Sequence, residues 1–159
     1  MKGKSIPPAP HSLEAVLDVW AALPRFPEPE SVCLDRLVDQ VHWIDDETSA
    51  RTWIAFFRAI GLIRHDPAGV YRGANRPDRQ QLVDRFLARV YGADAVGETL
   101  SPTIAIPLDE LASAVRIPPW EQRRHEAPER VWRERTKRLL DWYVLLGLAR
   151  ERNGRYRAV

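Results

Sequence analysis

Residues 33–41 read CLDRLVDQV, and residues 107–115 read PLDELASAV. Four of these nine positions are identical at an offset of 74 residues. Two later segments, FFRAIGLIR at residues 56–64 and WYVLLGLAR at residues 142–150, match at an offset of 86. An earlier apolar set repeats at an offset of 70: Leu13, Val16, Leu17 and Trp20 recur as Val83, Phe86, Leu87 and Val90. This period is too long for a solenoid and predicts two copies of one small domain.

The composition is that of an ordinary globular chain. Among its 159 residues, 45% are hydrophobic and 29% are charged. No apolar run approaches the ~18 residues of a membrane span, and the first residues lack the apolar core of a signal peptide. We therefore expect a cytoplasmic protein without a membrane partner. The single cysteine, Cys33, excludes an intrachain disulfide and a multi-cysteine zinc site, and its apolar neighbours predict a small core residue.

Charge is distributed unequally between the two halves. The whole chain carries a formal net charge of +2. Residues 1–78 hold 9 basic and 11 acidic side chains, whereas residues 79–159 hold 15 and 11. Such an asymmetry suggests that one half, the second, meets a polyanion.

The first copy is predicted over residues 12–73, after a flexible Pro-rich tail at residues 1–11. Ser12 is a plausible N-cap, and Gly61 is expected to end the third helix. The predicted elements are a helix from Leu13 to Leu23, a short strand over residues 31–33, a helix over residues 34–42, a helix from Asp45 to Ile60, and strands at residues 62–65 and 70–72.

The second copy is predicted over residues 79–159, with the boundary between copies at residues 73–79. Asn153-Gly154 is the strongest short hairpin signal in the chain. Because the repeat offset grows from 74 to 86, this copy should carry an insertion at about residues 117–129. Its predicted elements are a helix over residues 79–91, a loop, a strand over residues 103–106, helices over residues 108–116 and 128–146, and the final hairpin.

This order of elements, helix, short strand, two helices and a hairpin, resembles a winged-helix domain and occurs twice. The segments AIGLI at residues 59–63 and LLGLA at residues 145–149 resemble the junction between third helix and wing in winged-helix transcription regulators. The implied fold class is mainly α with small β-hairpins (α+β), as two tandem winged-helix domains. The resemblance implies double-stranded DNA binding, with the third helix in the major groove and the wing along the backbone. Winged helices also serve as protein-binding modules, so the fold alone does not decide the function.

The third helices carry apolar stripes at helical spacing. The expected core positions are Ala50, Trp53, Ile54, Phe57 and Ile60 in the first copy and Trp132, Thr136, Leu139, Leu140, Tyr143 and Leu146 in the second. A cofactor pocket built from these aromatic residues is the alternative. We favour a core, because the six tryptophans of the chain need burial.

The opposite face of the second copy is basic, and phosphate contacts require cations. The predicted DNA-binding residues are Arg123 and Arg124 of the insertion, Arg130, Arg133, Arg135, Lys137 and Arg138 of the third helix, and Arg150, Arg152, Arg155 and Arg157 of the wing. The alternative is a solvated helix with internal pairs, since Glu126–Arg130, Glu129–Arg133 and Glu134–Arg138 have i,i+4 spacing. The wing arginines favour DNA, because they have only Glu151 nearby.

In the first copy, Asp45, Asp46 and Glu47 lead the third helix. Helix capping explains them, and they would also repel phosphates. An outward-facing Phe56 would support a protein partner or a homodimer contact through this copy.

Catalytic motifs are missing from the sequence. The four histidines are scattered, and His125-Glu126 lacks the second histidine of a zinc protease motif. We expect no enzyme activity, no cofactor and no metal. The predicted function is DNA binding by a transcription regulator or by a replication or partition factor, and the alternative is a protein–protein scaffold without nucleic acid.

Overall fold

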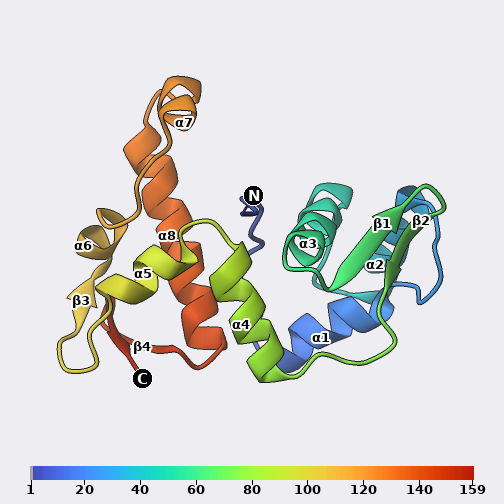
Figure 1. The fold of residues 1–159 in the computed structure, drawn as a ribbon, viewed down its shortest axis with the longest axis horizontal. Helices are drawn as coiled ribbons and strands as arrows, with labels where there is room; N and C mark the ends of the chain where they lie inside the picture. Colours follow the sequence, from blue (N-terminus) through green and yellow to red (C-terminus); the bar gives the residue numbers. More distant parts are fainter. Residues whose placement is uncertain (1) are drawn as a thin grey trace. The chain divides into compact units, whose positions relative to one another are not determined.

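The computed structural model describes residues 2–159 and consists mainly of helices with two small antiparallel sheets (Figure 1). The chain divides into two compact units, and the division falls between Val90 and Tyr91. Each unit contains a helix, a short extended segment, further helices and a β-hairpin in this order. The first unit has two helices between the extended segment and the hairpin and one helix after the hairpin, whereas the second unit has three helices between them. The expected class, mainly α with small hairpins, is confirmed.

The elements of the first unit are α1 (Leu13–Ala22), α2 (Glu30–Gln40), α3 (Glu47–Ala59), β1 (Ile63–Asp66), β2 (Gly69–Arg72) and α4 (Arg79–Arg89). Ser12 caps α1 as predicted, because its side chain accepts a hydrogen bond from the Ala15 N–H at 3.1 Å. Asp78 and Gln81 form a capping box at the start of α4. Side-chain caps therefore fix the first residues of both helices.

The N-terminal segment is packed against the first unit and is not a flexible tail. The Gly3 N–H donates to the Arg89 carbonyl at 2.7 Å, and Gly3 lies against Ala59 at a distance that leaves no space for a Cβ. Ile6 and Pro7 are buried. The prediction of a mobile tail was wrong. It was based on the proline content, whereas the burial of the apolar Ile6 side chain stabilises the packed segment.

The elements of the second unit are α5 (Ala93–Thr99), β3 (Ile106–Pro107), α6 (Leu108–Ala112), α7 (Pro119–Arg124), α8 (Pro128–Leu145), β4 (Ala149–Arg152) and β5 (Arg155–Ala158). The strand order is β3-β5-β4. In the first unit, the bridge between Glu28 and Val70 places a single extended residue beside β2 in the same way. In both units, therefore, an extended segment that precedes the second helix pairs with the second strand of the hairpin.

The repeated glycine junctions have the same hydrogen bonds in both units. The Gly61 N–H donates to Arg58 O at 3.1 Å and the Leu62 N–H donates to Phe57 O at 2.9 Å. The matching pairs are Gly147 with Val144 at 3.1 Å and Leu148 with Tyr143 at 2.8 Å. Both glycines have positive φ, 76° and 77°. These are Schellman caps, which end α3 and α8 and turn the chain into the wing.

The predicted core stripes of both third helices are confirmed, since every position named for them is buried. Phe56 is buried as well, with 1% of its surface exposed, so it does not supply the outward-facing side chain that would support a protein partner. Its ring packs edge-on against Trp53, with centroids 6.1 Å apart. Burial on α3 is thus wider than one helical stripe.

Two short strands lie elsewhere than predicted. Residues 31–33 belong to α2, and the extended residue is Glu28, which precedes Pro29; a residue before proline is held in an extended conformation. Residues 103 and 104 form a bend, because both of their N–H groups donate to the Ser101 hydroxyl at 3.2 Å. The strand begins only at Ile106, which again precedes a proline.

The paired residues also correct the repeat itself. Glu28 pairs with Val70 and Ile106 pairs with Tyr156. Val70 and Tyr156 are 86 residues apart, as in the sequence match, but Glu28 and Ile106 are 78 apart, not 74. The sequence match of the second helices is therefore shifted by four residues. One helical turn is about 3.6 residues, so this shift preserves the apolar face and is invisible to periodicity.

The first helix of the second unit was also misassigned. The helix before β3 is α5, in a stretch predicted to be a loop, whereas α4 clusters with the first unit. The Arg85 guanidinium of α4 donates to the Ile60 and Gly61 carbonyls at 3.1 and 2.9 Å. The predicted boundary at residues 73–79 thus precedes the division at Val90, because an amphipathic helix does not encode which unit it packs against.

Tyr143 ties α8 to α5 within the second unit, since its buried hydroxyl donates to the Ala93 carbonyl. Tyr143→Phe removes this bond, and we expect it to lower the free energy of unfolding by about 1 kcal/mol. For a chain of this size the thermal midpoint should fall by about 2–4 °C at neutral pH, measured by circular dichroism. Tyr71→Phe is the matched control, and equal midpoints for both variants would contradict the role of Tyr143.

Alkaline pH tests the same group, because burial raises the pKa of Tyr143 from its usual 10.0 to about 12. The neutral phenol is favoured in the folded protein, so its contribution is complete below pH 10 and is lost as the pH rises through about 12. The difference between wild type and Tyr143→Phe should therefore shrink across this range.

Candidate nucleic-acid interface

The pairing of β4 with β5 gathers four arginines on one face of the second hairpin. Arg150 lies opposite Arg157, and Arg152 lies opposite Arg155. Directly opposed residues share a face of the sheet, and so do residues two apart on one strand. All four side chains are exposed. The hairpin therefore presents one continuous cationic face, which we call the arginine face.

The opposite side of this hairpin turns inward. Tyr156 is 3% exposed, and burial raises the pKa of its hydroxyl. The tip is a tight turn with positive φ at Asn153 and Gly154, 54° and 76°, as in a type I′ turn. The predicted hairpin at Asn153-Gly154 is confirmed, and its turn holds the register on which the arginine face depends.

The arginine face carries no compensating acid. Glu151 lies on the other side of the strand, and its carboxylate accepts the Gly154 N–H at 2.8 Å. In the part of the chain that the structure describes, none of the four arginines forms an ion pair. Like charges directly opposed on a sheet destabilise it. This arrangement is relieved when an anion binds, which makes the face a candidate contact for phosphates.

The exposed side of α8 is basic but partly neutralised. Arg130, Arg133, Lys137 and Arg138 are exposed, as predicted. Arg133 pairs through Nε with Oδ1 of Asp109 in α6 at 2.5 Å, and Lys137 pairs through Nζ with Oδ1 of Asp141 at 2.7 Å. The hydrogen bond to Asp141 raises the pKa of Lys137. The partner of Arg133 thus differs from Glu129, the acid predicted for it at i,i+4 spacing, and no partner was predicted for Lys137.

Arg135 does not belong to the exposed face. Its guanidinium lies over the Trp132 ring, 5.4 Å from the centroid, and donates through Nη2 to the Tyr91 carbonyl at 2.8 Å. Burial lowers the pKa of Arg135 to about 10, so the group stays charged at neutral pH. The predicted exposure of Arg135 is not found, because position 135 lies beside the buried stripe of α8, and its predicted contact with DNA is not tested by the structure.

The insertion contains the short helix α7. Arg123 and Arg124 are exposed, as predicted, whereas Glu121 is 6% exposed. Nε2 of His125 lies 2.9 Å from Oε2 of Glu121, and Arg124 reaches Oε1 at 3.9 Å. Trp120 is 56% exposed, contrary to the expectation that the tryptophans are buried. Neither the buried acid nor the exposed aromatic ring was foreseen, because a six-residue helix has too short a pattern to show a face.

The first unit lacks an equivalent of the arginine face. At an offset of 86, its hairpin has Arg64, Asp66, Gly69 and Tyr71 where the second has arginines. Its other arginine, Arg72, is turned inward over the Trp20 ring at 4.6 Å, and burial lowers its pKa. The hairpins thus contribute part of the charge asymmetry between the halves, with net charges of +1 at residues 63–72 and +3 at residues 149–158.

The acidic start of α3 is a helix cap. Asp46 accepts the Ser49 N–H at 2.7 Å, and this bond lowers the pKa of the carboxyl. Glu47 pairs with Arg51 at 2.8 Å. Asp45 is exposed. The capping interpretation of the acidic triplet is confirmed for Asp46.

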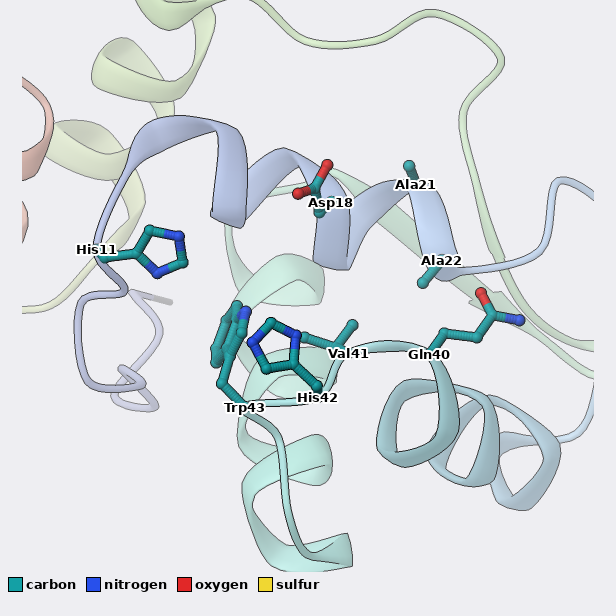
Figure 2. A pocket seen from close by; sticks show the side chains of 8 residues that line it. All are labelled: His11, Asp18, Ala21, Ala22, Gln40, Val41, His42 and Trp43. Atoms are coloured by element: carbon teal, nitrogen blue, oxygen red, sulfur yellow. The ribbon is translucent and has the colours of Figure 1, made fainter.

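A polar pocket of about 380 Å³ lies in the first unit (Figure 2). Asp18 projects from α1, while His42 and Trp43 lie together on the loop after α2, and His11 approaches them from the N-terminal side. Within residues 2–159, no group of three or more His, Cys, Asp or Glu side chains could hold a metal ion. Cys33 is buried and free, as predicted, and burial raises the pKa of its thiol.

None of the helices formed by residues 2–159 has the length and apolar character required to cross a membrane. No curated protein and no solved structure matches this chain. The family model described as the halobacterial double winged helix domain matches residues 1–159. This match covers both repeats and agrees with the two helix-and-hairpin units. The chain is therefore a tandem winged-helix protein and belongs to the halobacterial double winged helix domain family.

Proposed function

We propose that this protein binds double-stranded DNA without catalysing a reaction, and that it acts as a transcription regulator or as a replication or partition factor. The arginine face of the second hairpin is the observation that carries the proposal. Winged-helix families are typically DNA-binding and non-enzymatic, which supports the general assignment.

The wing is proposed as the main contact with phosphates. Duplex DNA carries about one negative charge per 1.7 Å of its axis, so a strip of four exposed guanidinium groups faces several phosphates at once. The four arginines of this face form no ion pair within residues 2–159. They can therefore bind phosphates without first breaking an ion pair, so little free energy is lost. Affinity from this face is independent of base sequence.

The third helix, α8, is proposed to read the major groove. Arg133 and Lys137 must exchange Asp109 and Asp141 for phosphates, so they add less affinity than the wing does. Arg138 remains the candidate for contact with base edges, and Arg135 is omitted because it is turned inward. Arg123, Arg124 and Arg130 extend the basic surface at the other end of α8.

The first unit is proposed to contact a protein partner or a second copy of the chain. Its hairpin lacks the arginine face, which makes it the weaker candidate for DNA. Phe26 is 76% exposed and Val32 is 41% exposed, and exposed apolar side chains favour protein contacts. A protein scaffold without nucleic acid remains the alternative function, supported by the same two side chains.

Salt dependence of duplex binding tests the wing. About four to six neutralised phosphates give a slope of roughly −4 to −5 for log affinity against log salt. Each of Arg150, Arg152, Arg155 and Arg157 changed to Ala should reduce the magnitude of the slope by about one on any sequence, measured by fluorescence anisotropy. Arg64→Ala, at the equivalent position of the first hairpin, is the control and should leave the slope unchanged. Wild-type affinity weaker than about 10⁻⁴ M at physiological salt would refute DNA binding.

Base selection separates the proposed role of Arg138 from that of Arg133. Arg138→Ala should cost about 1–3 kcal/mol on the preferred site and relax the base preference there, measured by competition between site variants. Arg133→Ala should weaken binding to all sequences alike. An identical sequence profile for both variants would show that α8 reads no base through Arg138.

A charge reversal in the first unit tests the division of roles. Asp45→Lys leaves the Asp46 cap in place. We expect the affinity for duplex DNA to stay within about twofold of wild type, because the proposed phosphate contacts belong to the second unit. A marked, salt-sensitive gain in affinity would instead place α3 at the DNA.

A further inference from the structure

Trp120 is placed outward by the side chains around it. Helix α7 spans Pro119–Arg124, and it is flanked by the buried Pro118. Glu121 is 6% exposed and points inward, whereas the neighbouring Trp120 is 56% exposed. Four other tryptophans of the chain are at most 4% exposed. One side of α7 is therefore held in the protein by the buried Glu121, and the Trp120 ring is exposed on another side.

The ring is accompanied by two cations. Arg123 and Arg124 follow Trp120 at i+3 and i+4, so they lie on the same side of α7. Both are exposed, and the contact of Arg124 with Glu121 is long, 3.9 Å. An aromatic platform beside cationic groups is the combination that holds single-stranded nucleic acid: bases stack on the ring and phosphates meet the cations.

The platform and the arginine face lie at opposite ends of α8. Helix α7 packs beside the start of α8, and the hairpin follows its end (Figure 1). Helix α8 has 18 residues, about 27 Å at 1.5 Å per residue. This length corresponds to roughly eight base pairs at 3.4 Å each. A nucleic acid that follows α8 from the wing would need about this length to reach α7.

We propose that Trp120, Arg123 and Arg124 form a site for an unpaired base next to a duplex held by the wing. This inference deepens the proposed function and rests on it. Bases inside a duplex are stacked on each other, so a base can stack on the exposed ring only where the strand is single. The preferred ligand is a duplex that ends in, or opens into, a single strand.

The test compares a blunt duplex with the same duplex carrying a short thymidine overhang, by anisotropy with the full chain. Wild type should bind the overhang form about 5- to 150-fold more tightly, the range that stacking of one base on an aromatic ring gives. Trp120→Ala should abolish this preference. Trp120→Phe should keep most of it, which separates stacking from a folding defect.

Ile104→Ala is the matched control, because Ile104 is an exposed apolar residue of the same unit, with 65% exposure, outside the platform. It should retain the full preference. No preference in wild type, or a preference that survives Trp120→Ala, would overturn the inference. If Trp120→Ala instead abolishes only self-association in light scattering, the platform is a protein surface and the inference is likewise overturned.

The two proposals fail separately. Duplex binding that depends on the wing arginines, without any overhang preference, leaves the proposed function intact and refutes the platform. Binding of a thymidine strand that depends on Trp120, with no blunt-duplex affinity, refutes wing-led duplex binding and retains the platform.

Discussion

Burial of Tyr156 decides on which side of the second hairpin the arginines lie. Side chains alternate along a strand, so an inward Tyr156 requires that Arg155 and Arg157 face outward. The Asn153-Gly154 turn then sets the register that places Arg152 and Arg150 opposite them. A slip of one residue would bury charge and expose the tyrosine. One core contact and one turn thus produce the surface on which the proposed function rests.

The two copies show how one frame carries different surfaces. Both end the third helix with the same glycine cap, and both pair an extended residue before proline with the second hairpin strand. In the first copy, Asp66 and Gly69 stand where the second has Arg152 and Arg155. These positions are exposed or near the turn in the second copy, so the core tolerates the change and the charge is free to differ.

The basic side of α8 illustrates why a count of cations overstates a binding surface. Arg133 and Lys137 already have carboxylate partners, and Arg135 packs on aromatic rings. Exposed ion pairs contribute little to stability, but they must be broken or shared before a phosphate is bound. The unpaired arginines of the wing carry no such cost.

Local sequence determined much of this protein. The glycine junctions, the Asn153-Gly154 turn, the apolar stripes of α3 and α8, and the alternation of arginines with Tyr156 in the wing follow from short-range patterns, because caps, turns and periodicity act within a few residues. Only the tertiary structure decided which unit α4 joins, the four-residue shift of the repeat, the inward Phe56 and Arg135, and the outward Trp120. Each of these depends on contacts between residues that are distant in the chain. The helical period in the sequence indicates that a helix has an apolar face, but it does not indicate which element packs against that face.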